Sequence, residues 1–380
     1  MTKQIYMDYC ATTPCDPRVV EKMLPYFTTF FGNPASSDHA YGWTAKDAVE
    51  AAREEVSRLI NAKNHAITFT SGATEAINLG IKGVMEASAK KGKHIITNKA
   101  EHKAVLDTCA YLEGKGYEVT YLDVDEHGNI SLDALENAVR KDTVMMAVQY
   151  ANNETGVIHP VAAIGTIARR HDVYFLCDAT QAAGKLPIDV TADNIDLLAM
   201  SGHKMYGPKG VGVLYVNSQP KVNLSVQQHG GNHERGRRSG TLNVPAIVGI
   251  GKAAAICQQE MQAEALRLAA LRDRLESSLT TAIAGTKVNG KQAVRLAQVS
   301  NLLFPGINGE QLLLSVSTRL ALSRGSACSS AQRIPSHVLM AMGATGDAAH
   351  DAIRFSLGRF TTEAEVDEAV NILVDAVLTL

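Results

Sequence analysis

A lysine and an aspartate each follow an apolar run that has the length of a buried strand. Lys204 comes shortly after the run 195–200, and Asp178 directly follows the run 173–177. Burial of a lysine is costly, and it lowers the pKa of the amine so that the neutral form can attack a carbonyl carbon. Taken alone, Lys204 fits an exposed turn and Asp178 a helix cap. The two residues together indicate a site that activates a carbonyl compound.

This pair fits pyridoxal phosphate. In enzymes that use this cofactor, a lysine amine carries the aldehyde and an acid keeps the pyridine nitrogen protonated. A phosphate-binding segment is also present, because the predicted strand 66–70 leads through residues 71–75 into a helix that continues to about residue 85. Free backbone amides and the positive end of the dipole at a helix start bind phosphate, although this signal is weak by itself.

Strands and helices alternate through this part of the chain, which predicts a mostly parallel sheet flanked by helices. Further strands are expected at residues 94–97 and 144–148. Ligands of such sheets gather outside the carboxyl ends of the strands. The polar residues expected at that edge are Thr74, His102, Asn153, Asp178 and Lys204.

The chain of 380 residues is long enough for two domains. A long alanine-rich helix is expected from residue 244 to about residue 283, followed by short strands near 300–304, 320–323 and 353–357 and a closing helix at 363–380. We therefore predict an α/β fold with a large cofactor-binding domain at residues 15–245. Residues 1–14 and 246–380 form the predicted smaller α+β domain, which includes the linking helix and the loop of the catalytic cysteine.

The composition is that of a globular protein without a charge bias. Hydrophobic residues make up 46% and charged residues 20%, and the net charge is −2. This balance favours neither direct nucleic-acid binding nor an anionic membrane surface. No signal peptide and no membrane span is recognisable, so we expect a cytoplasmic protein. The six cysteines show no metal-ligand spacing and are expected to be reduced, and no metal site is predicted.

The chain resembles the cysteine desulfurases of the NifS/IscS-like type, which belong to the class-V aminotransferase superfamily and to the fold-type I pyridoxal phosphate enzymes. The resemblance covers nearly the whole chain and implies a seven-stranded type of sheet. The motifs that carry it are DYCATTP (8–14), TSGATE (70–75), EHK (101–103), NNE (152–154), DATQ (178–181), SGHK (201–204), RSGT (238–241), GSACS (325–329) and IRFSLGR (353–359).

The resemblance implies how the cofactor is held. Lys204 carries it covalently, Asp178 pairs with the ring nitrogen, Gln181 donates to the ring oxygen, and His102 stacks on the ring and assists proton transfer. The phosphate is bound by Thr74 and the neighbouring backbone, which includes Ala73, and by Ser201 and His203, with Asn153 also close to the cofactor. Thr241 joins the phosphate site from the other subunit, which implies a homodimer.

The resemblance also implies the reaction. L-cysteine is bound through its carboxylate by Arg354 with Asn153, and the substrate side of the pocket includes Asn33 and Ala11. L-alanine is released, and the sulfur stays on Cys328 as a persulfide for an acceptor protein. Small and polar neighbours of Cys328 predict an accessible loop rather than a buried thiol.

Two substitutions depart from the family pattern. Cys10 stands where serine or asparagine is usual, beside the expected substrate pocket, and it is the first alternative nucleophile. Arg324 stands where serine is usual, and its charge could favour the thiolate of Cys328. The resemblance implies a sulfur-acceptor protein but does not identify it, and the alternatives are a scaffold of iron-sulfur cluster assembly, a tRNA thiolation enzyme and a DNA phosphorothioation system. The housekeeping iron-sulfur enzymes of this family continue with a tail that contacts their scaffold protein, whereas this chain stops at Leu380, soon after the closing helix. We therefore expect a dedicated acceptor rather than a general scaffold, and the alternative is that the sequence is a truncated one.

Other functions are compatible with parts of the sequence. A different fold-type I activity, such as a selenocysteine lyase or an aminotransferase, would need no reactive Cys328. An inactive scaffold for sulfur-transfer partners would need no cofactor site, and the intact set of Lys204, Asp178 and His102 argues against it.

Overall fold

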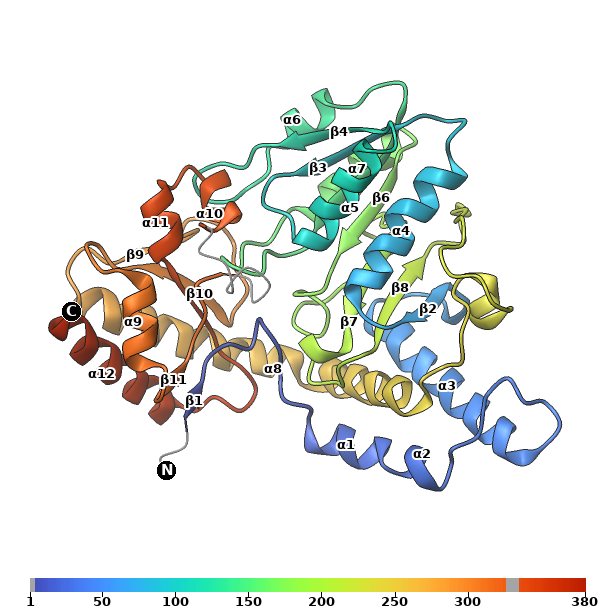
Figure 1. The fold of residues 1–380 in the computed structure, drawn as a ribbon, viewed down its shortest axis with the longest axis horizontal. Coiled ribbons are helices and arrows are strands. Elements are labelled where there is room, and N and C mark those ends of the chain that lie inside the picture. Colours follow the sequence, from blue (N-terminus) through green and yellow to red (C-terminus); the bar gives the residue numbers. More distant parts are fainter. Residues whose placement is uncertain (1–3, 326–334) are drawn as a thin grey trace.

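The computed structural model describes residues 4–325 and 335–380, and a seven-stranded sheet forms the centre of the larger part (Figure 1). The strand order is β2-β8-β7-β6-β5-β3-β4, and only β8 runs antiparallel to its neighbours. The predicted α/β class is confirmed. The bounds are β2 (Ile67–Thr70), β3 (His94–Asn98), β4 (Glu118–Leu122), β5 (Thr143–Gln149), β6 (Tyr174–Asp178), β7 (Leu197–Ser201) and β8 (Gly212–Val216).

The strands of this sheet are apolar on both faces because helices cover both faces. Alternate residues of one strand enter different cores, as Ile95 and Ile96 of β3 do. The core with Ile95 includes the helices α4 (Ala73–Ala87) and α5 (Lys103–Glu113). The core with Ile96 includes residues of α1 (Pro17–Met23), α3 (Ala40–Leu59), α7 (Val161–Arg170) and the first half of α8 (Val244–Ala282). Two short helices, α2 (Pro25–Thr28) and α6 (Leu132–Asn137), lie in the connections.

A smaller unit follows in the chain. Its sheet has the order β12-β10-β9, and β1 pairs in parallel with β11 beside it. The strands are β1 (Ile5–Tyr6), β9 (Lys287–Val288), β10 (Val299–Leu303), β11 (Leu320–Ala321) and β12 (Ile353–Ser356). The helices are α9 (Gly309–Val316), α10 (His337–Ala341), α11 (Gly346–Asp351) and α12 (Glu363–Thr379).

The helix α8 connects the two units. Figure 1 shows it as one long helix that begins under the large sheet and ends in the smaller unit. Its early residues, such as Ile250 and Cys257, are buried in a core of the large sheet, whereas Leu271 and Leu275 are buried with β12 and α12. The helix therefore belongs to both cores. The division at residues 14/15 and 245/246 stays a prediction.

No helix in the ranges 4–325 and 335–380 combines the length and the hydropathy that crossing a bilayer requires.

Candidate active site

A cavity of about 540 Å³ lies at the carboxyl ends of the strands in the large sheet. This volume is typical of a site for a small molecule or cofactor. Eleven of the thirteen predicted site residues that the structure describes line the cavity, namely Ala11, Ala73, Thr74, His102, Asn153, Asp178, Gln181, Ser201, His203, Lys204 and Arg354. The walls come from both units, because Lys204 follows β7 whereas Arg354 belongs to β12.

Three predicted site residues are not among the lining residues. Asn33 and Thr241 are exposed at other places on this single chain. Cys328 lies outside the described residues, so its predicted role stays a prediction.

Lys204 sits in a single helical turn, η2 (Gly202–Lys204), directly after β7. Its Nζ donates hydrogen bonds to the backbone carbonyl oxygens of Cys10 and Ala11, the latter at 2.7 Å. Burial is the main cause that lowers the pKa of this amine to about 8. About a tenth of the amine is therefore neutral and nucleophilic at pH 7, a far larger fraction than for an exposed lysine.

Asp178 and His102 are held by local hydrogen bonds. The Oδ1 atom of Asp178, at the end of β6, accepts from the backbone amide of Thr180 at 2.9 Å and from its hydroxyl group. His102 caps α5, and its Nδ1 accepts from the amide of Ala104 at 3.1 Å. The neutral ring therefore carries its proton on Nε2. Burial lowers the pKa of His102, which favours this neutral form.

The first turn of α4 is suited to binding an anion. Gly72 precedes this helix of 15 residues, and Ala73 and Thr74 begin it. Their free amides and the helix dipole favour a negative charge. Ser201 and His203 line the same cavity. Burial, together with the charge of Lys204, lowers the pKa of His203 to about 4, so this imidazole is neutral at neutral pH.

Arg354 is the charged group of the opposite wall, and it is 1% exposed. Its Nη1 donates to the carbonyl oxygen of Asn153 at 2.9 Å, and its Nη2 donates to Oδ1 of Asp8 at 2.7 Å. Its Nε has no hydrogen-bond partner among the residues that the structure describes. An unsatisfied buried donor of a fixed guanidinium is suited to binding a carboxylate.

Asp8 had no predicted role, and Cys10 was not among the residues predicted to bind substrate. Asp8 belongs to a recognised motif, but its pairing with Arg354 joins residues that are 346 positions apart. Cys10 lines the cavity, and its carbonyl oxygen accepts from both Gln181 and Lys204. The family resemblance had already placed Cys10 beside the substrate pocket, whereas the hydrogen bonds that its carbonyl oxygen accepts were not predicted.

Arg324 is anchored rather than freely exposed. Its Nη1 lies 2.8 Å from Nε2 of His350 and 3.8 Å from a carboxylate oxygen of Glu310. Arg324 is therefore not an exposed side chain without contacts.

The residues of the cavity fit pyridoxal phosphate. An amine with a lowered pKa, a carboxylate at a neighbouring strand end and an anion site at a helix start are the three groups that this cofactor needs. Within the described ranges, no group of three or more histidine, cysteine, aspartate or glutamate side chains is arranged to hold a metal ion.

Comparisons with known proteins agree with this arrangement. The aminotransferase class-V family matches residues 5–369, so the chain belongs to this family of pyridoxal phosphate enzymes. Within it the chain is a member of the cysteine desulfurases. It is 54% identical over 376 residues to a cysteine desulfurase IscS of Anaeromyxobacter sp. (strain Fw109-5), and the match covers 99% of this chain and 93% of that protein.

Solved structures show the same likeness. A NifS-like protein superimposes with a TM-score of 0.93 at 36% identity, with 100% of both chains covered. SspA in complex with cysteine gives a TM-score of 0.82, also at 36% identity, and covers 95% of this chain and 100% of that one.

Proposed function

We propose that this protein is a cysteine desulfurase that converts L-cysteine to L-alanine and retains the sulfur as a persulfide on Cys328. The proposal rests mainly on three side chains that line the same cavity. The amine of Lys204, with its pKa of about 8, shares the cavity with the carboxylate of Asp178 and the buried guanidinium of Arg354. The 54% identity to a protein named cysteine desulfurase IscS supports it independently.

The residues of the cavity would hold pyridoxal phosphate as follows. Lys204 would bind it covalently, Asp178 would keep its ring nitrogen protonated, Gln181 would donate to its ring oxygen, and His102 would lie against its ring. The phosphate would be bound by Thr74 and the amide of Ala73, by Ser201 and His203, with Asn153 nearby. When bound, the cofactor supplies an electron sink for the bonds at the α-carbon of the substrate.

The other steps are performed by groups of this chain. Arg354 binds the carboxylate of L-cysteine through its Nε and its fixed guanidinium plane, with Asn153 beside it and Ala11 in the wall. Lys204 and His102 move protons at the α-carbon and β-carbon. The thiolate of Cys328 attacks the sulfur atom of the substrate, the carbon–sulfur bond breaks, and alanine leaves. One sulfur atom has then moved from cysteine to Cys328, with no external oxidant or reductant.

We propose further that the active enzyme is a homodimer in which Thr241 completes the phosphate site of the other subunit. Arg238, in the same motif as Thr241, pairs with Glu75 of α4 at 2.8 Å, whereas Thr241 itself is exposed and does not line the cavity of its own chain. Exposed aromatic and aliphatic side chains gather on α1, α2 and the start of α3, around the segment of Asn33. They are Val20, Leu24, Phe27, Phe30, Phe31, Tyr41 and Trp43. A second copy of the chain would cover this apolar surface and bring Asn33 to the substrate side.

A mixing experiment tests this arrangement. In a mixed dimer of the Lys204→Ala and Thr241→Ala variants, one site carries both defects and the other site carries neither, if Thr241 acts across the interface. Mixing the two variants should then restore activity. Absence of rescue in a mixture shown to exchange subunits would place Thr241 in its own site or outside both.

The sulfur acceptor and the compartment are the remaining parts of the proposal. We propose a cytoplasmic enzyme that delivers persulfide sulfur to a protein acceptor for iron-sulfur clusters, tRNA thiolation or DNA phosphorothioation. The expectation of a dedicated acceptor stays a prediction. Calorimetric titration with each candidate acceptor, with complementation of a strain that lacks its housekeeping desulfurase, decides between them.

Purified enzyme and L-cysteine test the reaction itself. Alanine and sulfur should be produced in equal amounts, and the Cys328→Ser variant should produce neither in repeated turnover. Normal turnover of this variant would favour another activity of the family, such as a selenocysteine lyase, or Cys10 as the nucleophile.

A further inference from the structure

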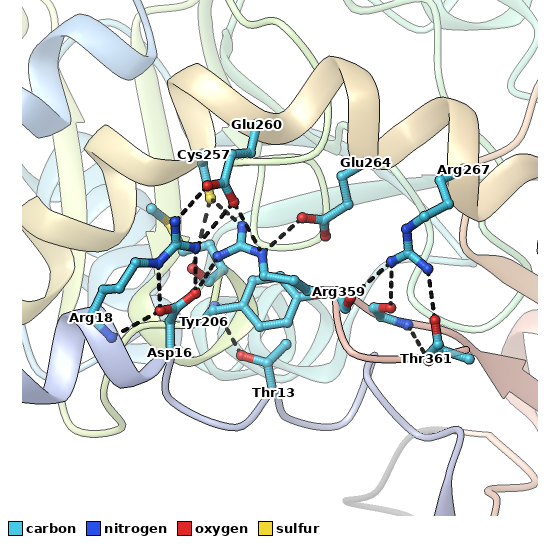
Figure 2. Close-up of polar contacts among 12 residues, drawn as sticks. Thr13, Asp16, Arg18, Tyr206, Cys257, Glu260, Glu264, Arg267, Arg359 and Thr361 are labelled. Atoms are coloured by element: carbon cyan, nitrogen blue, oxygen red, sulfur yellow. Dashed lines mark hydrogen bonds and ion pairs between the residues drawn. The ribbon is translucent and has the colours of Figure 1, made fainter. Parts of the chain in front are cut away.

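The two walls of the cavity continue into one polar network outside it. Lys204 and Arg354 stand on different units, so their separation depends on whatever fixes these units against each other. Tyr206 follows Lys204 by two residues, and Arg359 follows Arg354 by five. Figure 2 shows Tyr206 and Arg359 in direct contact beneath α8.

Arg359 contacts three separate segments of the chain. Its Nη1 donates to Oδ2 of Asp16 at 2.8 Å, and its Nε donates to Oε2 of Glu264 on α8 at 2.9 Å. Its guanidinium carbon lies 4.2 Å from the centre of the ring of Tyr206. The side chain of Arg359 is 10% exposed. Buried charges of this kind require their partners, so Arg359 fixes these segments relative to one another.

The backbone amide of Arg359 is also hydrogen-bonded within this network. Its amide donates to the hydroxyl oxygen of Tyr206 at 2.6 Å. Arg267 of α8 donates to the carbonyl oxygens of Arg359 and Thr361 at 2.9 and 2.7 Å, which holds the turn after β12 in place. The Tyr206 hydroxyl therefore links the turn after β12, the strand that carries Arg354, to the segment directly after Lys204.

The backbone at Tyr206 needs this support. Its φ of 61° lies in the left-handed region, which is unfavourable for a residue with a side chain. Its amide donates to Oγ1 of Thr13 at 2.9 Å, and its carbonyl oxygen accepts from the amide of Asp16 at 2.9 Å. Thr13 also binds the carbonyl oxygen of His203, the residue before Lys204. Such a conformation persists only where the surroundings impose it.

We propose that Tyr206 and Arg359 are positioning residues that set the place of the Lys204 amine relative to the guanidinium of Arg354. This inference rests on the proposed function, in which Arg354 holds the substrate carboxylate while Lys204 moves protons. Substrate binding depends mainly on Arg354, whereas the reaction also requires the Lys204 amine at the correct position relative to the Arg354 guanidinium. A displacement of about 1 Å between reacting groups can lower a rate by about a hundredfold.

The Tyr206→Phe variant tests the proposal with the loss of one oxygen atom. In the full-length holoenzyme, kcat for L-cysteine should fall by about tenfold while KM changes by no more than about twofold. The pH midpoint of the visible absorption of the bound cofactor should move upward, because a loosened turn admits water and favours the protonated form. A purely structural role would lower Tm without moving this midpoint.

Two further variants keep the test decisive. Thr13→Val keeps the shape of the side chain and removes both the acceptor for the amide of Tyr206 and the donor to the carbonyl oxygen of His203. Because both contacts hold the segment around Lys204, this variant should reproduce both effects if Tyr206→Phe folds poorly. Tyr121→Phe is the matched control, because Tyr121 lies on the edge strand β4, away from the cavity. Its hydroxyl donates to Glu113 at 2.8 Å, so this variant also loses one hydrogen bond. Its kcat and pH midpoint should equal those of the wild type.

Two outcomes separate this inference from the proposed function. Wild-type kcat and an unmoved pH midpoint in both Tyr206→Phe and Thr13→Val would overturn the positioning role and leave the desulfurase activity intact. A wild-type enzyme that releases no alanine from cysteine would overturn the proposed function. The midpoint shift in the variants would then still support coupling of Tyr206 to Lys204.

Discussion

The guanidinium of Arg354 donates to the carboxylate of Asp8 at 2.7 Å, and this contact joins β12 to the N-terminal segment at the wall of the cavity. A second nitrogen of Arg354 is bound by the carbonyl oxygen of Asn153, and the third, Nε, is unpaired among the described residues. The orientation of the carboxylate-binding group is therefore fixed before substrate arrives, which reduces the entropic cost of binding.

Replacement of Arg354 by lysine should raise KM for L-cysteine by about 10- to 100-fold. Lysine keeps the charge but loses the planar fork, and a hydrogen bond to a charged group contributes about 1.5–3 kcal/mol. Steady-state kinetics measure the effect. Arg274→Lys is the matched control, since Arg274 pairs with Asp367 on the surface of the smaller unit. Equal KM values for the two variants would exclude Arg354 from substrate binding.

The lowered pKa of Lys204 predicts the pH dependence of cofactor uptake. Only the neutral amine attacks the aldehyde, so the rate at which cofactor-free protein takes up pyridoxal phosphate should rise with pH, with a midpoint at about 8. His203, with a pKa of about 4, adds no second inflection between pH 6 and 9. Stopped-flow absorption measures this rate. A midpoint near the value of an exposed lysine, about 10.4, would contradict the burial of the amine.

The same shift predicts a change of stability with pH. An unfolded chain keeps Lys204 protonated up to its ordinary pKa, whereas the folded chain releases the proton at about 8. Between these values the unfolded state binds more protons, so the contribution of Lys204 to the stability of cofactor-free protein should rise with pH. The Lys204→Met variant should lack this rise in a comparison of urea unfolding at pH 8 and pH 10. Parallel pH profiles for variant and wild type would contradict the shift.

The sequence allowed prediction of the large sheet and of most of the cavity, because buried parallel strands are uninterrupted apolar runs. The run 173–177 corresponds to β6, and its polar end places Asp178 correctly at the cavity. The edge strand β4 was not predicted, since Glu118 to Tyr121 are only partly buried or exposed and give no apolar run. The short helices α10 and α11 were missed because five or six residues show no helical period.

Contacts between distant residues limited the prediction of the site. The pairing of Asp8 with Arg354 and the bond from Gln181 to the carbonyl oxygen of Cys10 depend on how two units pack, which no local pattern records. Asn33 and Thr241 followed from family resemblance, and neither lines the cavity of one chain. Their predicted roles depend on the proposed second copy, and the fold of a single copy does not test them.

Arg324 should affect the reactivity of Cys328, which lies four residues further along the chain. Cations lower the pKa of a cysteine thiol, so Arg324→Ala should raise the pH at which iodoacetamide alkylates Cys328. Arg324→Lys should give a smaller shift, and Arg319→Ala, an exposed neighbour, should give none. Superimposable alkylation profiles for wild type and Arg324→Ala would remove Arg324 from this role.

The most direct test of the central claim is mass spectrometry of the Cys328 peptide after one turnover. Wild-type holoenzyme treated with L-cysteine and digested without reductant should show a gain of one sulfur atom on Cys328, with one alanine released per active site. The Lys204→Ala variant should show no gain, because the loss of its amine should reduce the rate by at least about 10³-fold. Alanine release without added sulfur on Cys328, or added sulfur on Cys10 instead, would contradict the account.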